Sequence, residues 1–291
     1  MQSQVPTFTD DIDRHDWSAL GRMRYVREYA SFLKPVIIRG AFDHWPARTK
    51  WNLTFLRDRY GDLPITIDGE PRMLGPFIDE VLSSTPERPA PYLHNHLMAL
   101  WPTELQSDIA PMPECTRPNW LESRFFPSRQ RLTFIEVYIG GAGARFPTLH
   151  YDGLHTHAFL MQIQGVKEYV ALPPEAEPLL YTPYAGSNTS PVDVQHPDLE
   201  CHPLFAQATG FRFNLNPGET LFVPAGWWHT ARILSSSITI SINGVNAANW
   251  GYFFQDFRRT HCSSSLKGHL KAAYVQAFGF LHLVLAGAGI L

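Results

Sequence analysis

Three side chains that can bind a metal lie in two distant parts of the sequence, and they most constrain the fold. His150 and Asp152 stand two residues apart, and His229 follows Pro-Ala-Gly-Trp-Trp much further along the chain. Two imidazoles and one carboxylate, with other positions left open, suit non-haem Fe(II) and O₂ chemistry. Residues i and i+2 face the same way only on an extended backbone. The pattern therefore predicts a strand-rich fold in which both segments meet.

The triad motif alone is weak because His-x-Asp is short and arises by chance. A histidine beside two tryptophans is also more often packed and hydrogen-bonded than a metal ligand. Lys167 adds to the pattern because it interrupts an apolar stretch close after Asp152. A lysine that points into a barrel needs an anion, and a dicarboxylate provides one. The alternative is a hairpin tip at 165–167 with a solvated lysine.

Composition indicates a globular chain of 291 residues, with 44% hydrophobic and 18% charged residues. The formal net charge of −3 gives no general attraction to nucleic acid or anionic lipid. The 3 cysteines are far apart, which argues against a disulfide framework or a structural zinc site. A reducing compartment is expected, and we predict a cytoplasmic location.

Apolar alternation predicts strands at 132–139, 158–165, 167–174, 218–224 and 237–243. The second and third of these read as a hairpin that turns through Gly165. Helical patterns occur at 22–33, 53–61 and 76–83, whereas 85–127 and 174–217 read as mostly irregular. The pattern predicts one mainly β domain, a double-stranded β-helix (jelly-roll barrel) with flanking helices. Its parts are an N-terminal region at 1–131 packing on the barrel, a catalytic core at 132–245 and a C-terminal helical region at 246–291.

Several motifs in the same order resemble those of the JmjC, or cupin-like, 2-oxoglutarate oxygenases. Among these enzymes, the motifs most resemble those of the subgroup that contains the hypoxia-inducible-factor asparaginyl hydroxylase. The motifs are His150-Tyr151-Asp152, residues 162–167 with Leu172-Pro173-Pro174, Pro217-Gly218-Glu219, Phe222-Val223-Pro224, Trp227-Trp228-His229, residues 238–243 and the opening segment 34–40.

The resemblance implies His150, Asp152 and His229 as iron ligands, with Fe(II), 2-oxoglutarate and O₂ as cofactor and cosubstrates. It implies that Lys167 pairs with the distal carboxylate of 2-oxoglutarate, helped by the hydroxyl of Tyr92. Two further residues match cosubstrate-binding positions, Asn243 and, less closely, Thr148, because Pro147 stands where the family has its threonine. His155 and His157 lie in a segment longer than the family pattern, and we expect them to be exposed or to support the ligands.

The implied reaction is hydroxylation of a C–H bond in a protein or peptide side chain, with release of succinate and CO₂. Alternatives are a small-molecule or tRNA-base hydroxylase and an N-methyl-lysine demethylase. From another class, a cupin barrel can be a non-redox metal- or ligand-binding module or a sugar isomerase. A binding module does not need Lys167, so this residue favours an enzyme.

The C-terminal segment 272–291 is apolar and has no formal charge if His282 is neutral. It is long enough to span a bilayer, so a membrane tail anchor is one interpretation. We favour a helix packed against the barrel or a second subunit, and the family resemblance points to a homodimer. The predicted interface comprises Leu266, Leu270, Ala273, Val275, Phe278, Leu281 and Leu285.

Overall fold

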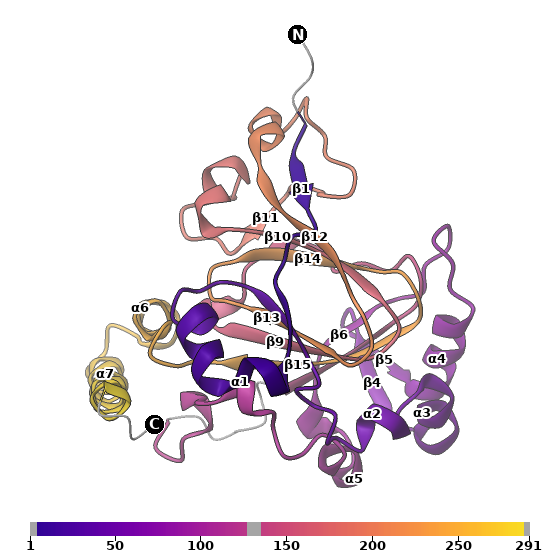
Figure 1. Cartoon of the computed structure of the whole chain (residues 1–291), viewed down its shortest axis with the longest axis horizontal. Coiled ribbons are helices and arrows are strands. Elements are labelled where there is room, and N and C mark those ends of the chain that lie inside the picture. Colours follow the sequence, from indigo (N-terminus) through magenta and orange to yellow (C-terminus); the bar gives the residue numbers. More distant parts are fainter. Residues whose placement is uncertain (1–4, 127–134, 288–291) are drawn as a thin grey trace.

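The computed structural model describes residues 5–126 and 135–287, and its centre is a double-stranded β-helix (Figure 1). Two facing sheets alternate along the chain, which confirms the predicted jelly-roll fold. One sheet has the core order β12-β10-β14-β8, and the other has β13-β9-β15-β7. The core strands are β7 Ile135–Gly140, β8 Leu149–His150, β9 His157–Gln164, β10 Lys167–Leu172, β12 Thr209–Leu215, β13 Glu219–Val223, β14 Trp228–Ile233 and β15 Ser237–Gly244.

Alternation along each strand separates the barrel interior from the layers outside it. On β9, Ala158 and Leu160 face inward, whereas Phe159 and Met161 pack outward under the N-terminal helices. These helices are α1 Trp17–Tyr25, the π-helix Val26–Ala30, α2 Ala47–Lys50, α3 Leu53–Tyr60, α4 Leu74–Leu82 and α5 Thr103–Ser107. The side chain of Asn52 caps α3 by accepting a hydrogen bond from the Phe55 amide at 2.8 Å, as its position before the helix predicts.

Strands from the N-terminal half extend both sheets. β1 (Thr7–Thr9) pairs with β12, and β3 (Val36–Arg39) pairs with β13 and with β2 (Arg14–Asp16). At the other edge, β6 (Leu93–Leu97) pairs with β7. β4 (Pro64–Ile67) and β5 (Glu70–Met73) form a separate hairpin. The two sheets thus draw strands from both sides of residue 131, and the predicted three-part division stays a prediction.

The expected hairpin between β9 and β10 is wrong. β9 pairs with β13 and β15, whereas β10 pairs with β12 and β14, so the chain crosses between sheets at this turn. Gly165 adopts φ 72° there, and a Cβ atom at this position would lie 2.3 Å from the Ser236 carbonyl oxygen. The glycine therefore allows close contact with the β14–β15 connection.

Two regions expected to be irregular contain barrel strands. β6 lies in 85–127. The segment 174–217 contains β12 and also the short β11 (Thr189–Ser190), which pairs with β8. The remaining parts of these regions hold short 3₁₀ turns at Met98–Leu100, Glu114–Thr116, Trp120–Glu122, Pro174–Leu179 and Pro203–Gln207. The prolines and polar residues around both strands concealed their short apolar alternation.

Two C-terminal helices, α6 (Trp250–His261) and α7 (Leu266–Gly287), lie side by side at the periphery (Figure 1). Gly279 of α7 packs directly on the Trp250 ring. Val275 and Phe278 are buried in this same cluster, so their predicted assignment to a symmetry mate is wrong. The outward face of α7 is exposed at residues such as Leu270, Phe280 and Leu281. By length and composition alone, α7 could cross a membrane.

Candidate metal centre

The three predicted ligands converge at one end of the barrel. His150 ends β8, and its Cα partner across the antiparallel pair is His229 on β14. Asp152 follows β8 on extended backbone (φ −62°, ψ 135°), which turns its side chain to the same side as His150. One donor atom from each residue lies within 4.8 Å of the others. The structure thus brings all three side chains together, while their role as ligands stays a prediction.

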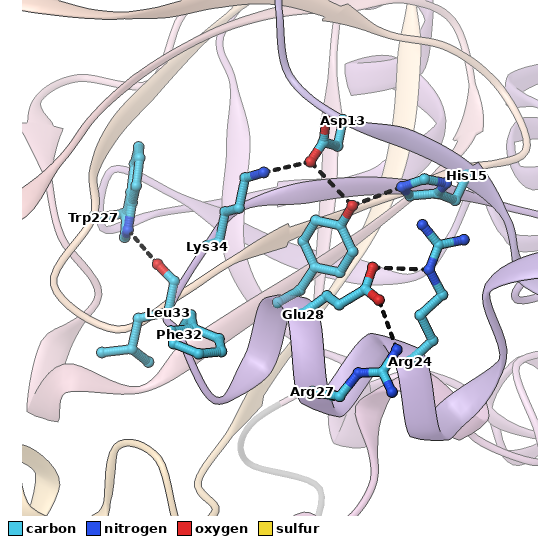
Figure 2. A pocket seen from close by; sticks show the side chains of 10 residues that line it. Asp13, His15, Arg24, Arg27, Glu28, Phe32, Leu33, Lys34 and Trp227 are labelled. Carbon is cyan, nitrogen blue, oxygen red and sulfur yellow. Dashed lines mark hydrogen bonds and ion pairs between the residues drawn. The ribbon is translucent and has the colours of Figure 1, made fainter.

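Backbone carbonyls fix the orientation of both imidazoles. His150 Nδ1 donates to the Thr148 carbonyl at 3.2 Å, and His229 Nδ1 donates to the Trp227 carbonyl at 3.0 Å. Because carbonyl oxygens only accept, each Nδ1 carries the proton and each Nε2 keeps a free lone pair. Trp227 is itself held, since its indole donates to the Leu33 carbonyl at 2.7 Å in a pocket on the outer surface (Figure 2).

The protonation states suit a divalent metal ion. Burial, with a smaller contribution from the neighbouring His229, lowers the pKa of His150 to about 3, so the imidazole is neutral at pH 7. Phe146 stacks on His150 with a centroid distance of 4.4 Å. Burial also raises the pKa of Asp152, which a bound cation would offset. Two imidazole nitrogens and one carboxylate match the donor set of a non-haem Fe(II) site.

Lys167 lies in the barrel interior and is 1% exposed, so the hairpin-tip alternative is wrong. Its Nζ donates to the Tyr92 hydroxyl at 2.9 Å and lies 5.4 Å from the centre of the Tyr138 ring. Burial lowers the pKa of Lys167 to about 7, and within 5–126 and 135–287 no carboxylate forms an ion pair with it. An ammonium has three donors, and the hydrogen bond to Tyr92 uses one of them, so the others are left for an anionic acceptor.

The spacing between Lys167 and the triad follows from strand register. On β10, Lys167 pairs with Ile233 of β14, and Ala171 pairs with His229. Four residues along a strand correspond to about 13 Å. A lysine side chain and a five-carbon dicarboxylate can together span this gap, with one carboxylate at the ammonium and the keto acid at the triad.

Asn243 and Thr148 have other contacts. The side-chain amide of Asn243 donates to the Thr156 hydroxyl at 3.0 Å, and the backbone carbonyl of Asn243 accepts from the Asn119 side chain. This places Asn243 against the loop that follows Asp152. Thr148 lines a neighbouring recess with Arg145 and Asp193, and its described contribution to the triad is its backbone carbonyl. Their roles in binding a cosubstrate stay predictions.

His155 and His157 are both held by protein contacts. His157 is fully buried and accepts a hydrogen bond from the Ala225 amide at 3.0 Å, so it is not exposed. His155 Nδ1 contacts the Asp256 carboxylate of α6 at 2.5 Å, and its ring stacks on Tyr252. The turn that leaves Asp152 is therefore tied to α6.

Sequence reasoning missed three residues in or next to the cavity. Tyr138 and Phe146 line it with the triad and Tyr92, and Glu136 lies beside Tyr138 on β7. Glu136 and Tyr138 alternate with Val137 and Ile139, which face the outer core. This two-residue period was visible in the sequence and could have assigned both polar side chains to the interior.

Comparison with known proteins agrees with this architecture. Residues 23–246 match the family described as the cupin-like domain. This chain belongs to that family. The match covers all strands from β3 to β15, and therefore the triad and Lys167. The finer resemblance to the asparaginyl hydroxylase subgroup stays a prediction.

The cupin-like domain is also similar to several curated proteins. It is 31% identical over 222 residues to Lysine-specific demethylase 8 of Xenopus tropicalis, covering 72% of this chain and 47% of that protein. It is 28% identical over 243 residues to Lysine-specific demethylase JMJ21 of Arabidopsis thaliana, covering 80% and 25%. With tRNA wybutosine-synthesizing protein 5 of Gallus gallus it shares 27% over 247 residues, covering 76% and 73%. The chain thus spans about half or less of the two demethylases.

Proposed function

We propose that this protein is an Fe(II)- and 2-oxoglutarate-dependent oxygenase that hydroxylates a C–H bond of a protein or peptide side chain. The observation that carries the proposal is the combination of two features in one barrel. Two imidazoles and a carboxylate converge, and further along the same interior lies a buried lysine that forms no ion pair with any carboxylate in the described parts of the chain. A binding module has no need of the lysine.

Each residue has a defined task in this proposal. His150, Asp152 and His229 would hold Fe(II), which, with bound 2-oxoglutarate, supplies the O₂-activating chemistry. Lys167 binds the distal carboxylate of the cosubstrate, and Tyr92 fixes the ammonium through their 2.9 Å hydrogen bond. The apolar interior, which includes Leu160 and Ala231, excludes water from the reacting groups.

A protein or peptide substrate is the leading choice among oxidative reactions. The curated relatives named as lysine-specific demethylases support an amino-acid side chain as the target. The relative named for tRNA wybutosine synthesis favours a nucleic-acid base as the second candidate. The net charge of −3 gives this second candidate no electrostatic support.

The proposal is tested with binding and turnover on the same protein. Calorimetry under anaerobic conditions measures 2-oxoglutarate affinity in the presence of Fe(II) or Mn(II), and succinate release measures turnover. Mass spectrometry of proteins in a cell extract, with and without enzyme, identifies a +16 Da product.

Asp152→Ala should abolish succinate release without unfolding the barrel, because it removes the one anionic ligand. Asp58→Ala, on the exposed surface of α3, is the matched control and should retain turnover. Fe(II)-dependent succinate release that survives in Asp152→Ala would refute the assignment of the triad.

A further inference from the structure

Glu136 is a carboxyl group in the barrel that the proposed chemistry does not use. On β7, Glu136 pairs with Ser241 of β15, Tyr138 pairs with Thr239, and Gly140 pairs with Ser237. Gly140 packs against Ile233, the partner of Lys167, so this end of β7 lies at the lysine end of the barrel. Glu136 is four residues further along, and its partner on β15, Ser241, lines the cavity with the triad. Glu136 therefore lies at the triad end.

The contacts of Glu136 leave its charge without a counterion. Its Oε2 atom is 2.8 Å from the Tyr138 hydroxyl, and that hydroxyl is also 2.6 Å from Asn95 Oδ1. When Glu136 is ionised, the phenol has one proton for two acceptors and cannot satisfy both. Burial raises the pKa of Glu136 to about 7, and among the described residues no cation pairs with it.

The backbone of β6 directs Asn95 toward this position. Asn95 adopts φ 52°, in the left-handed region that is uncommon for residues other than glycine. The β6–β7 register shifts between Leu93 and His96, which indicates a local bulge. As a result, an exposed amide and a half-buried carboxyl meet at the Tyr138 hydroxyl.

We propose that Glu136, with Asn95 and Tyr138, recognises a cationic substrate side chain, a lysine or an arginine, beside the metal centre. This inference rests on the proposed function and narrows its substrate class. A neutral amide could donate a hydrogen bond to Glu136 but would leave its charge uncompensated in a partly buried site. An ammonium or guanidinium supplies both donors and charge. An acidic side chain would be repelled by Glu136.

The test uses three synthetic peptides with the same flanking residues and a central lysine, arginine or norleucine. Calorimetry measures their binding to the Mn(II)- and 2-oxoglutarate-loaded protein, with 2-oxoglutarate affinity measured separately. At least one basic peptide should bind about tenfold more tightly than the norleucine peptide, as expected for a charge-assisted hydrogen bond. Glu136→Gln should reduce this preference to within about twofold. Glu175→Gln, at an exposed site, should retain it.

The possible failures are distinguishable. If the unmutated protein binds no 2-oxoglutarate, the proposed function fails. If it binds 2-oxoglutarate but holds all three peptides equally, the Glu136 inference alone is refuted, whether or not the variant folds. A preference for basic peptides that persists in a folded Glu136→Gln protein would also refute the role of this carboxylate.

Discussion

Titration of Lys167 should make 2-oxoglutarate binding strongly dependent on pH. The free protein holds this lysine with a pKa of about 7, because burial disfavours its charged form. The distal carboxylate of 2-oxoglutarate needs the charged form, so binding above pH 7 requires uptake of a proton. The affinity should then fall by up to tenfold per pH unit and by about 50-fold between pH 7 and pH 9.

Folding stability should show the opposite trend. Between pH 7 and the ordinary lysine pKa of 10.5, the unfolded chain holds a proton on Lys167 that the folded chain lacks. The free energy of unfolding of the ligand-free protein should therefore rise with pH, by up to about 1.4 kcal/mol per unit from this group. As pH rises above 7, the titration of Lys167 should therefore weaken 2-oxoglutarate binding and stabilise the ligand-free fold.

Calorimetry of the Mn(II)-loaded protein between pH 7 and pH 9 provides the assay, and buffers of different ionisation enthalpy count the protons taken up. Lys167→Met should bind 2-oxoglutarate about 10- to 150-fold more weakly at pH 7, with little further change at higher pH. Lys267→Met, exposed on α7, is the control and should behave as the unmutated protein. Constant affinity in the unmutated protein, or an equally steep decline in Lys167→Met, would refute the reasoning.

Three other predictions follow from contacts outside the cosubstrate site. Asp256→Ala removes the carboxylate that holds His155. It should lower Mn(II) affinity about tenfold, which is the smaller end of the loss seen when residues that support metal ligands are removed. Calorimetry that finds unchanged affinity would disprove the link to α6. Gly165→Ala should lower the free energy of unfolding, measured in urea, by about 3 kcal/mol, because its Cβ would lie 2.3 Å from the Ser236 carbonyl oxygen. Gly69→Ala is the control: it has a positive φ but open space around its Cβ, and it should lower this free energy by about 1 kcal/mol. The predicted homodimer should dissociate when Leu270 and Phe280, both exposed on α7, become glutamate. Light scattering that finds the unmutated chain monomeric would exclude the homodimer. Partition of the unmutated chain into detergent would favour the membrane anchor.

Much of the barrel could be predicted because its strands carry a strong local signal. The alternation at 218–224 and 237–243 gives β13 and β15 within a residue or so of the observed ends. Extended backbone at His150 and Asp152 also follows from their spacing. The meeting of His150 with His229 was predicted from their shared metal chemistry and from the family resemblance, since cross-strand pairing over such a distance leaves no local pattern.

The errors have a common physical origin in long-range pairing. Two apolar segments joined by Gly165 look like a hairpin, yet the partners of β9 and β10 come from elsewhere in the chain. The strand β6 is short, contains two histidines and an asparagine, and becomes a strand through its pairing with β7. Burial of Val275 and Phe278 depended on the position of Trp250, which α7 alone does not reveal.

The N-terminal edge strands have a consequence for how the protein can be produced. β3 covers the outer edge of β13, and β6 covers the outer edge of β7. A fragment limited to 132–245 would present these edges to other chains and should aggregate. During synthesis the problem is reversed, since β3 leaves the ribosome long before β13 exists. Because a strand without its partner promotes misassembly, the yield of folded protein should depend on how β3 is protected during that interval.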